Sequence, residues 1–425
     1  MPHPTLSSDE HDSDATAGRP HVSTWTDKLS QFDLFSYLSA NLSGKAFLVS
    51  AVIGFAICCL LGYASTKINW FKNFQRFYPG ISLETNYFPT ISQMRAVVRQ
   101  KLKPGQILVI VGGSSIFNGV GQPREKIWTD KLQRLLGDRY CVCNFAFRSA
   151  LPFEAGYIAA ESLCKEYPKT IYVTNTPPVS VGLPGGSSER YGYLYGQALY
   201  RGFLLDDAER KNSVSENLKS LTGVEAEKSV ETDLRNRLDS VFYFSDLWNA
   251  VAMKGFSTVW RAGPNPFGPR RKTQDIEPES APLATRFKDE ETLEKKIIRD
   301  TSSHVFSMNA AGDWQPVESE WQRIEHEISH VIPASMREHV LVVFTPNCHY
   351  FVNKLTADEQ RRDHLLYEYG VKRWQHAGLQ TVSATNLVDE DFFDRLHLNA
   401  LGGEKVAILV AHQIQSMSDK IERFK

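Results

Sequence analysis

Apolar residues along the chain fall into two kinds of run, and these predict strands alternating with helices. Short apolar runs rich in β-branched side chains suit buried strands, whereas apolar residues three or four apart suit amphipathic helices. The expected strands are Ile107–Val111, Tyr140–Phe145, Thr170–Thr174, Val340–Phe344 and a short one near Gln380–Val382. The expected helices are Pro123–Leu136, Phe153–Tyr167, Ala357–His376 and a last one from Lys405 to about Ile421. This alternation predicts an α/β fold with right-handed crossovers and a parallel sheet.

One long apolar segment stands apart from this pattern. Ala46–Ala64 contains no charged residue, is bounded by Lys45 and Lys67, and is about long enough to cross a bilayer core. A buried core helix usually keeps one polar face, and a signal peptide follows a shorter, less acidic tail. Residues 46–66 are therefore expected to form one transmembrane helix. The basic residues near its two ends give at most a slight preference for a cytoplasmic C-terminal side.

The segments on either side of this helix are polar or amphipathic. Residues 1–25 are rich in Ser, Asp, His and Pro, which predicts a disordered tail. Trp25–Leu42 has apolar residues at helical spacing, typical of an amphipathic helix on a membrane surface or on a partner protein. Residues 1–45 thus form the N-terminal region. Residues 67–104 form an aromatic and basic stalk that ends in a short helix, Ile91–Leu102.

A long stretch, residues 178–335, interrupts the α/β pattern. It begins with a Gly/Ser/Pro-rich loop at Val181–Ser188, continues with a helix at Leu234–Trp260, and later contains a charged run at Asp289–Arg299. A connection of this length must have its own structure or function. We therefore expect a mainly helical lid or docking insertion, with the sheet formed by residues 105–177 and 336–425.

Composition and charge exclude several classes of function. The 425 residues leave room for two or three domains, and 42% hydrophobic and 23% charged residues are ordinary for a globular chain. A net charge of −1 gives no indication of a nucleic-acid partner. Six cysteines in so long a chain do not form a disulfide framework, and no metal-ligand spacing is present. The sequence therefore predicts no metal and no cofactor.

The first candidate for chemistry is the turn after Ile107–Val111. Gly112 and Gly113 end this apolar run, and Ser114 and Ser115 follow directly. A buried strand that ends at glycines and releases a serine before a helix exposes the hydroxyl next to backbone N–H groups. Such a turn can present a nucleophile, but similar turns also bind phosphate or only reverse the chain.

The second candidate is the loop before the last helix. Asp394 precedes His397 by three residues, so the carboxylate can hold one imidazole nitrogen while the other faces a serine. The alternative is a helix-capping aspartate beside a surface histidine. Several polar residues follow predicted strands at the edge where open α/β sheets bind ligands: Ser115, Ser149, Asn175, Asn347 and His397. Asn347 and the nearby His349 are candidate substrate contacts.

Together these segments resemble the SGNH (GDSL-like) hydrolases and transferases. The first block of the family fits Gly113-Ser114-Ser115-Ile116-Phe117-Asn118-Gly119, with the nucleophile at Ser115, because a choice of Ser114 would put Asn118 at the closing glycine. The last block, Asp-x-x-His, falls on Asp394 and His397. The second block begins at Asn144 and has Ser149 in place of the oxyanion-hole glycine. The third block places Asn175 without its usual neighbouring glycine and aspartate. The resemblance covers about 105–177 and 336–425.

This resemblance implies a fold, a mechanism and a setting. The fold would be the flavodoxin-like SGNH three-layer arrangement. Ser115, His397 and Asp394 would form a triad, and the backbone N–H groups of Ser115 and Ser149 with the Asn175 amide would bind the oxyanion. The layout is similar to membrane-anchored SGNH proteins that modify the cell envelope.

That setting implies transfer of an acyl group, acetyl in the first instance, onto a hydroxyl of an envelope polysaccharide. It also implies a multi-spanning membrane O-acyltransferase as partner and a catalytic domain on the extracytoplasmic side. Two alternatives stay open at this point. One is an esterase or deacetylase, and the other is a non-catalytic, membrane-tethered assembly protein with a decayed SGNH fold.

Overall fold

The computed structural model describes eight segments of the chain: residues 44–68, 74–77, 89–147, 150–185, 189–206, 208–212, 223–251 and 305–423. It divides into a unit Met1–Ile57 and a unit Cys58–Lys425, and the second holds the sheet. The predicted tail, the amphipathic helix at Trp25–Leu42, most of the stalk and the charged run at Asp289–Arg299 lie outside the described residues.

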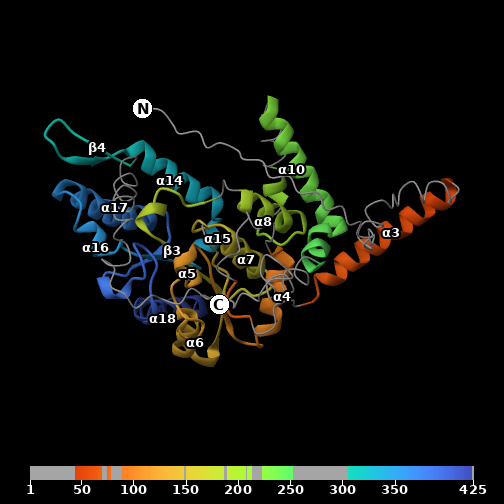
Figure 1. Cartoon of the computed structure of the whole chain (residues 1–425), viewed down its shortest axis with the longest axis horizontal. Coiled ribbons are helices and arrows are strands. Elements are labelled where there is room, and N and C mark those ends of the chain that lie inside the picture. Colours follow the sequence, from red (N-terminus) through yellow and green to blue (C-terminus); the bar gives the residue numbers. More distant parts are fainter. Residues whose placement is uncertain are drawn as a thin grey trace, which may run out of the picture. The chain divides into compact units, whose positions relative to one another are not determined.

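A five-stranded parallel sheet forms the centre of the second unit (Figure 1). Its strands are β1 (Ile107–Val111), β2 (Tyr140–Asn144), β3 (Thr170–Thr176), β6 (Val340–Phe344) and β7 (Gln380–Ser383). They lie in the order β2-β1-β3-β6-β7, with Val109 of β1 paired to Val142 on one side and Ile171 on the other. The predicted α/β fold with a parallel sheet is confirmed. The strand order is the one that flavodoxin-like doubly wound sheets use.

Alternate residues of the strands face two separate cores, one on each side of the sheet. On β1, Leu108 and Ile110 belong to one core, and Val109 and Val111 belong to the other. The first core is covered by α4 (Ile91–Lys101), α7 (Ala155–Cys164), α14 (Glu318–Val331) and α17 (Ala357–His376). The second is covered by α6 (Trp128–Leu136) and α18 (Ala400–Arg423), which lie together in Figure 1. Both faces of the sheet are therefore buried, which explains the continuous apolar strands.

Some element boundaries differ from the predicted ones, for local reasons. The first helix after β1 begins at Trp128 rather than Pro123, after a 3-10 turn η2 (Arg124–Lys126). The last helix begins at Ala400, five residues before Lys405, because the Asn399 side chain accepts hydrogen bonds from the N–H groups of Leu401 and Gly402.

The described part of the insertion is helical with one small hairpin. It contains α8 (Glu189–Tyr200), α10 (Gly223–Phe242), helical residues 244–251 and an antiparallel pair, β4 (Phe306–Met308) and β5 (Trp314–Pro316). The single helix predicted at Leu234–Trp260 is wrong, because Tyr243 adopts a left-handed backbone (φ 58°) and breaks it. Residues 252–260 lie outside the described residues. The three-residue strands of the hairpin are too short to give a recognisable alternation in the sequence.

The predicted transmembrane segment forms α3 (Gly44–Ser65), a single helix that is long and apolar enough to cross a membrane. Most of its side chains are exposed, and the two buried residues, Gly62 and Ser65, lie in its last turn. Tyr63, in its last turn, contacts the ring of Tyr243 (5.4 Å between centroids), whereas the large apolar side chains from Phe47 to Leu61 are all more than a third exposed.

Close contact between α7 and the end of β1 gives a test of the fold. A Cβ on Gly156 would lie 2.5 Å from the Cα of Gly112, whereas a Cβ on Gly192 of α8 would meet nothing within 4 Å. We expect Gly156→Ala to destabilise the full chain by about 1–3 kcal/mol through overpacking. Gly192→Ala is the control and should be neutral or stabilising by up to about 1 kcal/mol, since alanine favours helix. Urea unfolding midpoints measure both, and equal effects would contradict the described packing.

Candidate active site

The turn after β1 is a one-turn helix, α5 (Ser115–Asn118), whose first residue is Ser115. Gly113 has φ +87°, and a Cβ on it would lie 2.7 Å from Asn175 Oδ1 and from Thr174 Oγ1. Gly119 ends α5 in the left-handed region with φ +86°. Side chains other than hydrogen are disfavoured at both positions. The glycines thus set the geometry that places Ser115 at the edge of the sheet.

The structure separates the two adjacent serines. Ser114 is the N-cap of α5: its Oγ accepts a hydrogen bond from the N–H of Ile116 (3.3 Å), and its own N–H donates to Asn175 Oδ1 (3.2 Å). Ser115 has a different partner, because its Oγ lies 2.6 Å from His397 Nε2. Ser114 therefore shapes the turn, and Ser115 is the serine that faces the histidine.

His397 is held by Asp394 through both its ring and its backbone. His397 Nδ1 lies 2.6 Å from Asp394 Oδ2, and Asp394 Oδ1 accepts the N–H groups of His397 (2.7 Å) and Leu396 (2.9 Å). Burial alone would raise the pKa of Asp394, but the hydrogen bonds and the charge of His397 bring this pKa below its usual value. An ionised Asp394 favours the tautomer with the proton on Nδ1, which leaves Nε2 free to accept the Ser115 proton.

Backbone contacts fix the loop that carries Asp394 and His397. The N–H of Phe393 donates to the carbonyl oxygen of His397 (2.7 Å), and the N–H of Cys348 donates to that of Arg395 (2.9 Å). The second bond ties the loop to the segment after β6. About a fifth of each side chain, 22% for His397 and 23% for Asp394, is exposed, so the pair remains accessible to a substrate.

The predicted oxyanion donors are placed only in part. The N–H of Ser115 lies at the start of α5, where the helix provides no acceptor for it. Asn175 lies inside β3, one residue before its end, and its Nδ2 donates to Ser114 Oγ (3.2 Å). Ser149 lies outside the described residues. The oxyanion roles of Ser149 and Asn175 therefore stay predictions.

The two predicted substrate contacts differ in their surroundings. Asn347 is buried; its Nδ2 donates to Asp363 Oδ1 (2.9 Å), and its Oδ1 accepts from Arg395 (3.4 Å). It thus links the end of β6 to α17 and to the loop of Asp394. His349 is exposed at the start of α16 (His349–Val352). A contact of either residue with substrate stays a prediction.

Three residues that support the site were not among the predicted ones. Arg76 donates to the carbonyl oxygens of Gly119 (2.6 Å) and Asn118 (3.1 Å), which places a cation at the C-terminus of α5. Asn118 Nδ2 donates to the carbonyl of Ala146 (2.8 Å), and Asn144 Nδ2 to that of Phe117 (2.9 Å). Asn144 opens the second block of the resemblance, which was a usable signal. Arg76 gave no signal, because nothing in the sequence places it beside α5.

The arrangement suits nucleophilic catalysis by a serine. A hydroxyl, an imidazole and a carboxylate lie in sequence at hydrogen-bonding distance, which is the geometry that acyl transfer through a serine ester requires. Among the described residues, no group of three or more His, Cys, Asp or Glu side chains could hold a metal ion.

Asp363 gives a pH-dependent test of the support around this site. Burial raises its pKa from 3.8 to about 6, although Asn347 and nearby Arg395 oppose the shift. At a pH between these two pKa values, the folded chain keeps a proton on Asp363 that the unfolded chain has lost. The free energy of unfolding therefore falls as pH rises through this range. Asp363→Asn should therefore gain about 1 kcal/mol in stability, relative to the unmodified chain, between about pH 5 and about pH 8.

Unfolding midpoints of the full chain at about pH 5 and at about pH 8 measure this effect. The exposed Asp138→Asn is the matched control and should show a much smaller change between the two pH values. If Asp363→Asn shifts stability equally at both, the raised pKa is wrong.

Comparisons with protein-family models, with curated proteins and with solved structures find no significant match to this chain. The function of this chain must therefore be inferred from the geometry of the site itself.

Proposed function

We propose that this chain is a membrane-anchored serine acyltransferase that moves an acyl group, acetyl in the first instance, onto a hydroxyl of an envelope polysaccharide. The observation that carries this proposal is the pair of 2.6 Å contacts that joins Ser115 to His397 and His397 to Asp394. A capping aspartate beside a surface histidine would not need the second imidazole nitrogen to face a serine at the start of a helix.

The proposed reaction has two steps, acylation of Ser115 and transfer of the acyl group to the acceptor. Ser115 Oγ attacks the acyl carbonyl while His397 Nε2 takes the hydroxyl proton, and His397 then gives a proton to the leaving group as the acyl-Ser115 ester forms. An acceptor hydroxyl next loses its proton to His397 and attacks this ester. The acyl group passes to the acceptor, and Ser115 Oγ regains its proton. Asp394 keeps the imidazole in the required tautomer throughout.

Two features of the chain favour transfer over hydrolysis. A freely soluble esterase has no need of a helix such as α3, which is long and apolar enough to cross a membrane. The insertion also offers a row of exposed apolar side chains on α10 and residues 244–251. This row consists of Val230, Leu234, Leu238, Val241, Phe244, Trp248 and Val251. Such a row suits docking of a membrane protein, and a multi-spanning O-acyltransferase is the partner implied by the SGNH resemblance. We also propose that the catalytic domain lies on the extracytoplasmic side, because the SGNH resemblance implies that orientation.

A serine-reactive phosphonate probe tests the nucleophile. Ser115→Ala should abolish labelling of the full chain, because the hydroxyl that His397 activates is lost. Ser114→Ala is the matched control. It should keep labelling, with a loss of about 1 kcal/mol in stability from the missing helix cap. Undiminished labelling of the Ser115→Ala protein would refute the assignment.

Product partition distinguishes transfer from hydrolysis. The full-length protein in membranes is supplied with an acyl-ester donor, with and without an oligosaccharide acceptor, and free acid and acylated sugar are both measured. A transferase should form mainly acylated sugar at saturating acceptor, because transfer requires that water stay out until the acceptor hydroxyl is in place. If free acid dominates under these conditions, a tethered esterase replaces the proposal.

A further inference from the structure

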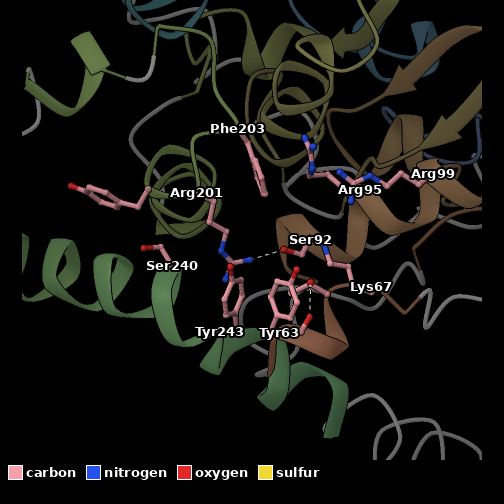
Figure 2. A pocket seen from close by; sticks show the side chains of 11 residues that line it. Tyr63, Lys67, Ser92, Arg95, Arg99, Arg201, Phe203, Ser240 and Tyr243 are labelled. Carbon is pink, nitrogen blue, oxygen red and sulfur yellow. Dashed lines mark hydrogen bonds between the residues drawn. The ribbon is translucent and has the colours of Figure 1, made fainter. Parts of the chain in front are cut away.

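A cavity separate from the Ser115 site lies next to the end of α3. It has a volume of about 390 Å³ and shares no residue with the Ser115 site. Figure 2 shows its side chains converging from the last turn of α3, from α4, from the end of α8 and from α10. The lining residues are Tyr63, Thr66, Lys67, Ser92, Arg95, Arg99, Tyr200, Arg201, Phe203, Ser240 and Tyr243. Four of them are cations, and none is an aspartate or glutamate.

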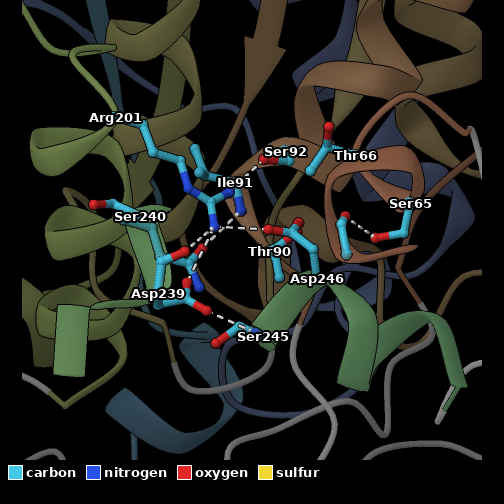
Figure 3. Close-up of polar contacts among 12 residues, drawn as sticks. Ser65, Thr66, Thr90, Ile91, Ser92, Arg201, Asp239, Ser240, Ser245 and Asp246 are labelled. Carbon is cyan, nitrogen blue, oxygen red and sulfur yellow. Dashed lines mark hydrogen bonds and ion pairs between the residues drawn. The ribbon is translucent and has the colours of Figure 1, made fainter. Parts of the chain in front are cut away.

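One of these cations, Arg201, is already neutralised within the protein. It is 3% exposed, and its guanidinium pairs with Asp239 (3.1 Å) and Asp246 (2.7 Å). It also donates to Ser92 Oγ (2.6 Å), as Figure 3 shows. Asp246 in turn accepts a hydrogen bond from the Thr90 hydroxyl (2.6 Å). This buried cluster fastens α10 and the following helical residues to α4. Arg201 is therefore a structural residue of the cavity wall.

The other three cations, Lys67, Arg95 and Arg99, outnumber the carboxylates that pair with them. Arg95 and Arg99 share one carboxylate, that of Glu166, at 2.8 Å and 2.9 Å. Lys67 lies over the Tyr63 ring (5.0 Å), and no carboxylate within the described residues forms an ion pair with it. Among the described residues, Glu166 is thus the one ion-pair partner of these three cations.

Arg95 is the buried arginine of this group, and one of its donors is unpaired in the described part of the chain. The side chain of Arg95 is 7% exposed, and its Nε has no hydrogen-bond partner within the described residues. Burial, and after it the charge of neighbouring Arg99, lower the pKa of Arg95 to about 10, although the charge of Glu166 opposes this shift. A bound anion would supply the missing negative charge and a hydrogen-bond acceptor.

We propose that this cavity binds a phosphate group, held by Lys67, Arg95 and Arg99. The four cations of the lining pair with only three carboxylates, those of Glu166, Asp239 and Asp246, which leaves one positive charge to match the negative charge of a phosphate ester. Ammonium and guanidinium groups both bind phosphate oxygens. Thr66 and Lys67 directly follow the last residue of α3. If α3 crosses a bilayer, these residues lie at the level of the lipid head groups, and the aromatic rings of Tyr63, Tyr243 and Phe203 suit that interface.

The same phosphate chemistry has two sources, an anionic lipid head group and a free phosphate. The full chain is tested against both, in nanodiscs of phosphatidylcholine with and without phosphatidic acid, and in neutral detergent with inorganic phosphate. The variant is Lys67→Gln with Arg99→Gln, because both side chains are exposed and neither belongs to the Arg201 cluster. The charge-matched control is Lys103→Gln with Lys126→Gln, two exposed lysines that do not line the cavity.

We expect the variant to weaken phosphate binding about twenty-five-fold, since each cation near an anionic group is worth about fivefold in affinity, and the control to leave it unchanged. Calorimetry measures inorganic phosphate, and ³¹P line broadening measures phosphatidic acid in the nanodiscs. A loss seen with phosphatidic acid alone identifies a lipid site, and a loss seen with inorganic phosphate identifies a site for free phosphate. If neither ligand binds, or if the variant and the control bind alike, the proposal is overturned.

Failure of this proposal is distinct from failure of the proposed function. The variant leaves Ser115, His397 and Asp394 untouched, so phosphonate labelling should be equal in the variant, the control and the unmodified chain. Equal labelling also shows that a loss of phosphate binding does not come from misfolding.

Discussion

The hydrogen bond between Ser115 and His397 depends on the parallel sheet and on the two loops that carry these residues. It joins residues 282 positions apart in the chain, so no local propensity can form it. Ser115 is placed by β1 and by the glycines around α5, and His397 by the loop between β7 and α18. The observed order of the sheet and the packing of α18 on α6 bring the two side chains to a distance of 2.6 Å.

This dependence explains which parts of the site could be predicted from the sequence. β1 and β6 are buried along their whole length, so their apolar runs were unambiguous, and both strands begin and end where expected. Ser115 and His397 follow from the rule that parallel strands present their carboxyl ends at one edge. The choice between Ser114 and Ser115 came from the position of Gly119, and the structure gives the reason: Gly119 ends a one-turn helix that begins at Ser115.

The residues that support the site, such as Arg76 and Asp363, could not be predicted from the sequence, because they act through long-range contacts. Arg76 caps α5 from a segment that has no regular spacing, and Asp363 meets Asn347 from the middle of α17. The break at Tyr243 was missed for a related reason. A tyrosine has no preference for the left-handed region, and only its surroundings hold it there. Its ring packs on Tyr63 (5.4 Å), and its carbonyl lies against Gly62, where a Cβ would come within 2.7 Å.

Most cations of the cavity beside α3 do not help to orient that helix in a membrane. The positive-inside rule counts basic residues in short loops within about 15–20 residues of a span. Lys67 falls in that range, but Arg95, Arg99 and Arg201 belong to folded elements farther along the chain. Their charge therefore carries no information about topology, and the slight preference from the flanking residues is not strengthened by them. Two neighbouring cations, Arg95 and Arg99, repel each other, so a local negative charge must offset this repulsion. Glu166 supplies one negative charge for the pair, and a phosphate in the cavity would supply the remainder.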